Sequence, residues 1–238
     1  MIEIRYGGRL GNQMIQFLAA SILSEKTGMP ISNPLKTSII KYDCDSTLFG
    51  RSRQIDMNDE DYFEMIEGGS FDSENFYRLL SYCQDEKYTS LFSKNRIFLN
   101  QPAEDEYIEG VFVHVRLDDI LGWHSLENEG NRYMPFEYFD KALEKIKFTK
   151  GYISSDSIGH ETIKRLSEKY GLEIFCDSPE NTIRFGSKFS NKILSLGTFS
   201  WWIGFLGNQN NVIHPNTEKH VKWHGDIFNV EGWNVGEY

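Results

Sequence analysis

The chain has 238 residues, of which 39% are hydrophobic and 25% are charged, a balance typical of globular proteins. Its formal net charge of -10 argues against nucleic acid or an anionic membrane surface as a general partner. No run reaches the ~18 apolar residues of a membrane span and no signal peptide is evident at the start, so only peripheral membrane contact stays open. Three scattered cysteines, Cys44, Cys83 and Cys176, fit free thiols in a reducing compartment, which predicts a cytoplasmic protein.

The N-terminal part opens on an apolar strand, predicted over 2–6, and continues with a helix over 12–27 that ends at Gly28. The region that follows has a weaker pattern. Its helical spacing predicts two short amphipathic helices, over 59–67 and 74–83.

A polar stretch over 100–106 contains a proline and shows no hydrophobic period, so we place a domain boundary there. Residues 1-105 form the predicted N-terminal α/β lobe, and residues 106-238 form the C-terminal lobe. In the C-terminal lobe strands alternate with helices, which indicates βαβ units and a parallel sheet. Strands are predicted over 111–115, 151–154, 172–176, 192–196 and 211–213, and helices over 135–147, 160–170, 179–185 and 201–206. The polar segment 117–134 is expected to be a loop at the edge where open α/β sheets bind ligands.

Two of the predicted strands break into a glycine-containing turn that opens a helix. The first turn is Gly7-Gly8-Arg9-Leu10-Gly11-Asn12-Gln13-Met14, and the second is Gly197-Thr198-Phe199-Ser200-Trp201-Trp202. Such a turn presents backbone N–H groups and the positive end of a helix dipole, which together suit an anion. Two of them in one chain predict a phosphorylated ligand held between two lobes.

The segment Val113-His114-Val115-Arg116-Leu117-Asp118-Asp119 brings a histidine, an arginine and two aspartates to the end of a strand. Strand alternation places His114 and Arg116 on the same face. The planar fork of Arg116 matches two phosphate oxygens, so this residue is a candidate for binding a diphosphate. A structural pair between the arginine and an aspartate explains the same residues equally well.

The segment Ser154-Ser155-Asp156-Ser157 stands at the end of another predicted strand. Asp156 can accept hydrogen bonds from a ribose or a base, although Ser and Asp also commonly cap a following helix. At the second glycine turn the hydroxyls of Thr198 and Ser200 suit a phosphate, and the alternative is again a simple helix cap. Trp201 and Trp202 are assigned to the core rather than to ligand stacking.

Three further patterns are weak. Asp43-Cys44-Asp45 has the Asp-x-Asp form that binds a metal–nucleotide complex in one class of sugar transferases, but no convincing apolar strand precedes it. His220 and His224 are spaced i, i+4, but no third ligand stands at a suggestive spacing, so surface histidines are favoured over a metal pair. The first glycine turn is not a G-x-G-x-x-G fingerprint, and no Walker lysine follows it.

Taken together, these segments resemble the α-1,2-fucosyltransferases of glycosyltransferase family 11, within the fucosyltransferase superfamily. The N-terminal motif of that family, G-G-L-G-N-Q-M-F-Q, is similar to 7–16 here, and its H-x-R-R-x-D motif is similar to 114–119. Its F-S-D-D segment is similar to 154–157, its S-x-F-S-W-W-G segment to 198–204 and its closing segment to 226–233. The motifs keep their order and span nearly the whole chain.

Several departures leave the superfamily assignment intact and bear on the donor sugar and the acceptor. Leu117 stands in place of the second arginine of the H-x-R-R-x-D motif, which removes a positive charge, and Asp118 adds a negative one. Ser157 replaces the second aspartate of the F-S-D-D segment, and Leu196 stands where an asparagine is common. The chain is also shorter than most members.

The resemblance implies a GT-B-like α/β fold, with two Rossmann-like lobes of mostly parallel sheets facing a nucleotide-sugar cleft. It implies an inverting, metal-independent transfer of L-fucose from GDP-fucose to a hydroxyl of a glycan acceptor, such as the 2-OH of galactose. The N-terminal lobe is then the acceptor side, and the C-terminal lobe binds the GDP-sugar. Two alternatives stay open, namely transfer of another GDP-linked sugar and a non-catalytic module that binds a nucleotide-sugar or a glycan.

This chemistry assigns roles to the candidate residues, because without a metal the charge of the leaving group needs cationic side chains and oriented N–H groups. Arg116 is expected to neutralise the β-phosphate. Asp119 and His114 are the candidates for the base, and Asp119 alternatively only orients Arg116. Asn12 is expected to position phosphate or sugar, and Asp156 to bind the nucleoside. The other residues expected at the donor are Gly11, Arg9, Ser155, Thr198, Phe199 and Ser200.

Overall fold

The computed structural model describes residues 1–42, 53–121, 133–208, 210–219 and 225–237. The chain divides into two compact units, Met1–Asn100 and Gln101–Tyr238. The division falls inside the polar stretch 100–106, where the hydrophobic period of the sequence is interrupted.

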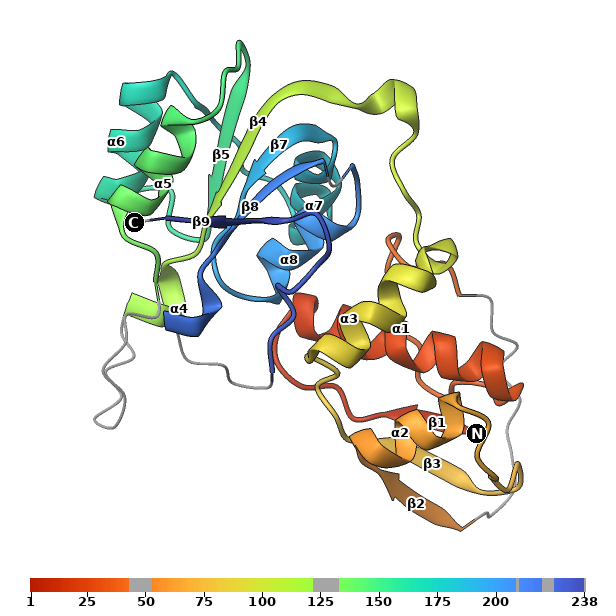
Figure 1. The fold of residues 1–238 in the computed structure, drawn as a ribbon. Helices are drawn as coiled ribbons and strands as arrows, with labels where there is room; N and C mark the ends of the chain where they lie inside the picture. Colours follow the sequence, from red (N-terminus) through yellow and green to blue (C-terminus); the bar gives the residue numbers. More distant parts are fainter. Residues whose placement is uncertain (43–52, 122–132, 209, 220–224, 238) are drawn as a thin grey trace. The chain divides into compact units, whose positions relative to one another are not determined.

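The N-terminal unit contains a parallel sheet of three strands in the order β1-β3-β2. The strands are β1 (Ile2–Ile4), β2 (Gln54–Met57) and β3 (Phe76–Leu79). The helices are α1 (Leu10–Thr27), α2 (Asp59–Ile66), α3 (Glu86–Lys94) and a 3-10 turn over Arg96–Phe98. Helices α1 and α2 lie over one face of this sheet (Figure 1).

The prediction of a helix over 74–83 is wrong, because β3 occupies this segment as the central strand of the sheet. Burial alternates along β3, with Tyr77 and Leu79 buried and their neighbours half-buried. All four residues of β3 pair with β2 on one side, and the last three also pair with β1 on the other. These tertiary hydrogen bonds override a local spacing that is compatible with a helix, as is common for short segments.

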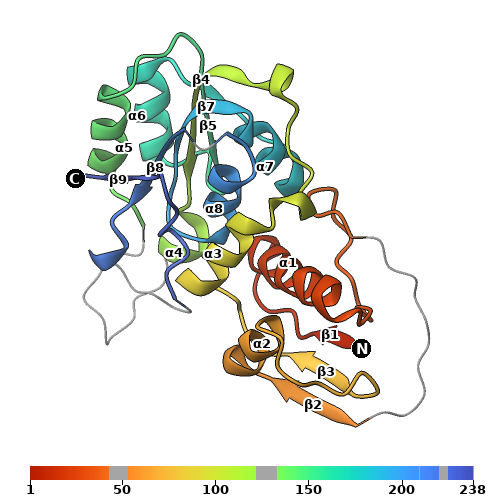
Figure 2. The same ribbon diagram turned by 45° about the vertical axis from the view of Figure 1, so that its right-hand side comes forward.

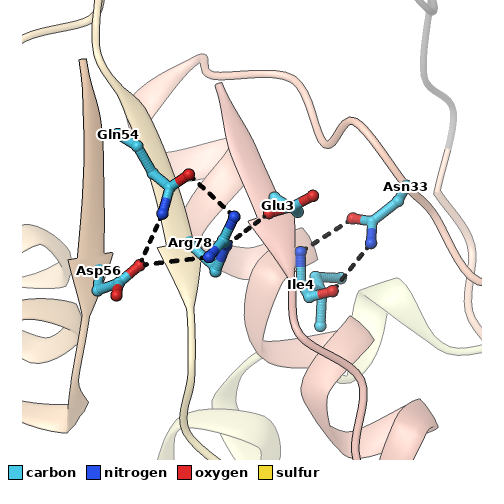
Figure 3. Close-up of polar contacts among 6 residues, drawn as sticks. All are labelled: Glu3, Ile4, Asn33, Gln54, Asp56 and Arg78. Carbon is cyan, nitrogen blue, oxygen red and sulfur yellow. Dashed lines mark hydrogen bonds and ion pairs between the residues drawn. The ribbon is translucent and has the colours of Figure 1, made fainter.

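The face of this sheet that carries Glu3 and Arg78 is polar, and Figure 3 shows a set of side chains that runs across the three strands. The Arg78 guanidinium on β3 donates to Glu3 on β1 at 2.7 Å and to Gln54 on β2 at 2.9 Å. At the edge of β1, the Asn33 side chain bonds both the N–H and the C=O of Ile4 at 2.9 Å. Asn33 therefore satisfies part of an otherwise open strand edge.

The C-terminal unit contains a sheet of six parallel strands in the order β6-β5-β4-β7-β8-β9. The strands are β4 (Ile108–Val115), β5 (Gly151–Ser155), β6 (Glu173–Ile174), β7 (Phe189–Ile193), β8 (Asn211–Pro215) and β9 (Asn234–Gly236). Taken in chain order within this unit, they run 3-2-1-4-5-6, the Rossmann arrangement. The order reverses between β4 and β7, which makes this pair the topological switch point.

Helices cover both faces of the larger sheet, as Figures 1 and 2 show. One face carries α5 (Phe136–Glu144) and α6 (Glu161–Tyr170), and the other carries α7 (Pro179–Ser187) and α8 (Thr198–Phe205). Among its described residues, the unit also has short helical turns over Glu104–Glu106, α4 (Asp118–Leu121) and Thr217–Lys219. A sheet covered on both faces explains the nearly continuous apolar character of β4.

The predicted elements of this unit form with shifted ends. Pro135 is the N-cap of α5 rather than its first residue. Helix α8 begins at Thr198, earlier than predicted, because Gly197 leaves the strand with a φ of 109° and turns the chain directly into the helix. Strand β9 is not predicted from the sequence, because its three residues include Asn234 and carry no apolar run.

The core of the C-terminal unit lies on both sides of the sheet. On the α5/α6 face a cluster of buried residues includes Val113, Ile153, Tyr138 and Leu166. On the α7/α8 side Trp201 and Trp202 are fully buried, which confirms their assignment to the core. Across the described ranges, no helix has both the length and the hydropathy that a membrane crossing requires.

Candidate functional site

Most of the site residues predicted in the C-terminal unit lie near the carboxyl ends of β4, β5 and β7. Open α/β sheets bind ligands at this edge, beside the switch point. The β4–β7 ladder ends at the pair Val113–Ile193, and the two chains continue past it as separate segments. Arg116 follows β4, and the turn 194–197 follows β7, so both stand at the opening between the two strands.

Arg116 is held by its backbone at this opening. Its N–H donates to the Ser195 hydroxyl at 2.9 Å, and the same hydroxyl donates to the C=O of His114 at 2.8 Å. Ser195 is 1% exposed. The sequence predicts Ser195 only as part of a strand, because a serine that leaves a strand carries no pattern of its own.

The guanidinium of Arg116 lies against Gly197, the N-cap residue of α8. A Cβ built on Gly197 would stand 2.5 Å from Nη1 of Arg116, so any other residue here would displace the guanidinium from this position. Gly197 also has a φ of 109°, a conformation that disfavours any other residue. A half-buried cation therefore lies at the start of a helix whose dipole is positive at the same end.

His114 lies beneath this surface and is 6% exposed. Its Nδ1 shares a hydrogen bond of 2.6 Å with the Ser200 hydroxyl of α8, and its ring lies 4.9 Å from that of Phe199. The pKa of His114 is lowered to about 4, mainly by burial, while Asp156 opposes this shift and Arg116 adds to it. The imidazole is therefore neutral near pH 7. With a pKa this low it is also too weakly basic to act as an effective general base at that pH.

Asp156, which is predicted to bind the nucleoside, follows β5 and is hydrogen-bonded to the segment after β4. Its Oδ1 accepts the N–H of Leu117 at 2.8 Å and the Ser155 hydroxyl at 3.4 Å. The carboxylate is exposed and does not cap the next helix, since the N-cap of α6 is His160. Asp156 thus stands beside the segment that carries Arg116, with its position set by the backbone after β4.

The next two residues of the motif after β4, Leu117 and Asp118, differ in burial. Leu117 is fully buried in the core cluster on the α5/α6 face, so the position that carries the second arginine in the family motif faces the core here. Asp118 is exposed at the start of α4. Asp119 belongs to the same helical turn, and its side chain lies outside the described part of the structure.

The glycine turn of the N-terminal unit is a compact structure of its own. Gly8 has a φ of 71°, and a Cβ there would stand 2.1 Å from Nδ2 of Asn12, so the asparagine side chain folds over the turn. The N–H of Gly7 donates to Gln16 at 2.9 Å, and Gln16 donates to the C=O of Arg5 at 3.2 Å. Helix α1 begins at Leu10 with exposed Arg9 as its N-cap residue, and Gly11 is buried in the first turn.

Two weak patterns of the sequence lie outside the described residues, namely Asp43-Cys44-Asp45 and the pair His220 and His224. In the segments that the structure describes, no group of three or more His, Cys, Asp or Glu side chains is arranged to hold a metal ion. In the C-terminal unit the structure brings together His114, Arg116, Asp156, Phe199 and Ser200. Buried Thr198 opens the helix that carries the last two.

Solved structures share this fold. Fucosyltransferase NodZ from Bradyrhizobium matches with a TM-score of 0.55 and 12% sequence identity, over 93% of this chain and 96% of that chain. A structure of NodZ α-1,6-fucosyltransferase soaked with GDP-fucose matches with a TM-score of 0.53 and 12% identity, over 93% and 97% of the two chains. No protein-family model matches the sequence, and no curated protein matches it. The chain therefore has the α/β fold of these GT-B enzymes, with parallel sheets and Rossmann-like lobes, which confirms the predicted fold class.

Proposed function

We propose that this protein is a glycosyltransferase that transfers L-fucose from GDP-fucose to a hydroxyl group of a glycan acceptor. The observation that carries the proposal is the position of Arg116. Its guanidinium lies at the N-terminus of α8, beside the switch point of a Rossmann-like sheet. The fold shared with NodZ and the ordered family 11 motifs support the same donor.

The donor diphosphate fits this edge of the sheet electrostatically. Arg116 supplies a planar cation, and the first turn of α8 supplies the positive end of a helix dipole. The hydroxyl of Thr198 stands at the same helix start. We assign the β-phosphate to Arg116, the phosphates and the sugar to the surface formed by 197–200, and the nucleoside to Asp156 and Ser155.

The reaction is a single displacement. The oxygen of the acceptor hydroxyl bonds to the anomeric carbon of fucose as the bond from that carbon to the β-phosphate oxygen breaks. GDP leaves with the electron pair, and the hydroxyl proton passes to a base. The leaving group gains negative charge as the bond stretches, so Arg116 and the α8 terminus stabilise the transition state more than the bound donor. Cationic and N–H groups take the place of a divalent ion in this scheme.

The burial and the low pKa of His114 argue against it as the base. We assign it a positioning role instead, since its ring connects β4 to Ser200 and Phe199 on α8. Asp119, the other candidate from the sequence, stays the proposed base.

We propose that the N-terminal unit serves the acceptor side and that Asn12, Gly11 and Arg9 contact the sugar or a phosphate. The family 11 resemblance favours inversion and an α-1,2 linkage to galactose, whereas the NodZ match includes an α-1,6 enzyme. We also propose that the protein is cytoplasmic, because the thiol of Cys176 is exposed and free, as is usual in a reducing compartment.

The test is to incubate the purified chain with GDP-fucose and measure GDP release, with and without a panel of galactose-containing oligosaccharides. We expect slow release alone and faster release with an acceptor, and NMR of the product gives the linkage. Tight GDP-fucose binding with no release would favour the non-catalytic module. A larger shift in melting temperature with another GDP-sugar than with GDP-fucose would reassign the donor.

A further inference from the structure

We propose that Ser195 is a positioning residue for Arg116, and that its hydroxyl sets the affinity of this site for a diphosphate. The inference rests on the proposed function, because it concerns the same GDP-sugar site. It adds a residue that makes no contact of its own with the donor and acts through the arginine.

Ser195 lies just beyond the end of the β4–β7 ladder. The last paired residues are Val113 and Ile193, and beyond them the C=O of His114 and the N–H of Arg116 face the segment after β7. The Ser195 hydroxyl accepts from Arg116 at 2.9 Å and donates to His114 at 2.8 Å. One buried hydroxyl thus bridges the two strands at the point where their backbones separate.

The segment that carries this hydroxyl is itself rigid. Leu194 donates its N–H to Ile213 of β8 at 2.9 Å, and its C=O accepts the hydroxyl of Tyr138 at 2.8 Å. Tyr138 is itself fully buried. Ser195 therefore projects from a backbone that both β8 and α5 hold in place.

One short turn contacts both ends of Arg116. Ser195 holds the backbone N–H, and Gly197, two residues later, lies against the guanidinium. Without the hydroxyl, the N–H of Arg116 and the C=O of His114 lose their shared partner, and the chain shifts where the arginine leaves the strand. A displaced guanidinium binds a diphosphate less well, while a nucleoside without phosphates is unaffected.

The experiment measures the affinities of GDP and guanosine by calorimetry for the wild type, Ser195→Ala and Arg116→Ala. We expect Ser195→Ala to weaken GDP binding about tenfold, equal to about 1.4 kcal/mol, and to leave guanosine affinity within about twofold. Adding Ser195→Ala to Arg116→Ala should cause no further loss, since the hydroxyl acts through that side chain. An additive loss in the double variant, or an equal loss for guanosine, would overturn the inference.

The matched control is Ser187→Ala. Ser187 is also fully buried, and its hydroxyl donates to the C=O of Arg184 at 2.9 Å. It precedes β7, so it belongs to the opposite edge of the sheet. This variant should lose stability without changing the ratio of GDP to guanosine affinity. A changed ratio would show that the effect of Ser195→Ala on GDP affinity comes from a general loosening of the fold.

The same measurements separate the two proposals. If the wild type binds GDP no more tightly than guanosine, the donor proposal fails and this inference fails with it. If the wild type prefers GDP and Arg116→Ala removes the preference while Ser195→Ala keeps it, only the role of Ser195 is wrong.

Discussion

Arg116 carries the proposed chemistry at the scale of single residues. Its environment is built from the residues around it, with Ser195 at its N–H and Gly197 at its guanidinium. The adjacent Leu117 points into the core. Arg116 is therefore the one arginine or lysine of the β4 motif, and it lies at the start of α8. The proposed reaction depends on this residue for that reason.

Replacing Arg116 with Ala should lower kcat by about a hundredfold or more, because a contact that strengthens in the transition state is lost. The half-buried side chain is not part of the core, so the variant should keep its fold by circular dichroism. Arg165→Ala is the control, since Arg165 is an exposed residue of α6 that lies over the Phe136 ring. Near-normal turnover of Arg116→Ala would remove this residue from the mechanism.

The low pKa of His114 predicts how stability depends on pH. The pKa is about 4 in the folded chain and ordinarily ~6.5 when unfolded, so the unfolded chain binds more protons between these values. The contribution of His114 is therefore fully present above about pH 6.5 and is lost as the pH falls toward 4. We expect a loss of about 2 kcal/mol in unfolding free energy between pH 7 and pH 5.

His114→Gln should flatten this part of the pH profile in urea unfolding. Burial also lowers the pKa of His214, so its contribution to stability has the same sign, and His214→Gln measures its share. A pH profile that is unchanged in His114→Gln would show that the imidazole is not neutral and buried in solution.

At the scale of elements, β3 is the clearest case of a segment decided by its neighbours. Its residues alternate between the covered face and the polar face of the sheet, and Arg78 spans from β1 to β2 on the polar face. A helix over the same residues would place Phe76 and Leu79 together on one side.

Substitutions in β3 should reflect this alternation. Leu79→Ala should cost about 2–5 kcal/mol of unfolding free energy, because Leu79 is fully buried under the helices. Arg78→Ala should cost at most about 1 kcal/mol, since its ion pair with Glu3 is partly exposed. Urea unfolding checks both values, and similar losses for the two variants would contradict the strand.

At the scale of the whole molecule, each unit has a parallel sheet and a glycine turn between a strand and a helix. In the N-terminal unit the turn joins β1 to α1, and in the C-terminal unit it joins β7 to α8. The proposed division of labour gives the acceptor to the first unit and the GDP-sugar to the second.

The proposed division also assigns the charge of the leaving group to protein groups, so a chelator should leave transfer unchanged. We expect the same rate of GDP release with EDTA as with added manganese. A rate that falls with EDTA and returns with manganese would instead assign a metal role to Asp43 and Asp45.

The sequence by itself determined the α/β class, because alternating strands and amphipathic helices have periods that survive in a single chain. It also identified the polar residues that follow β4, β5 and β7, since the carboxyl ends of parallel strands meet at one edge. Both predictions rest on the spacing of residues within short segments, which can be read from the sequence directly.

Only the tertiary structure decided how those residues act. Partners far away in the chain make β3 a strand, bury Leu117 in the core and place the Ser195 hydroxyl between two strands. The same holds for His114, which burial and a neighbouring arginine keep neutral. Burial and the field of distant groups set these properties, and neither can be read from spacing along one segment.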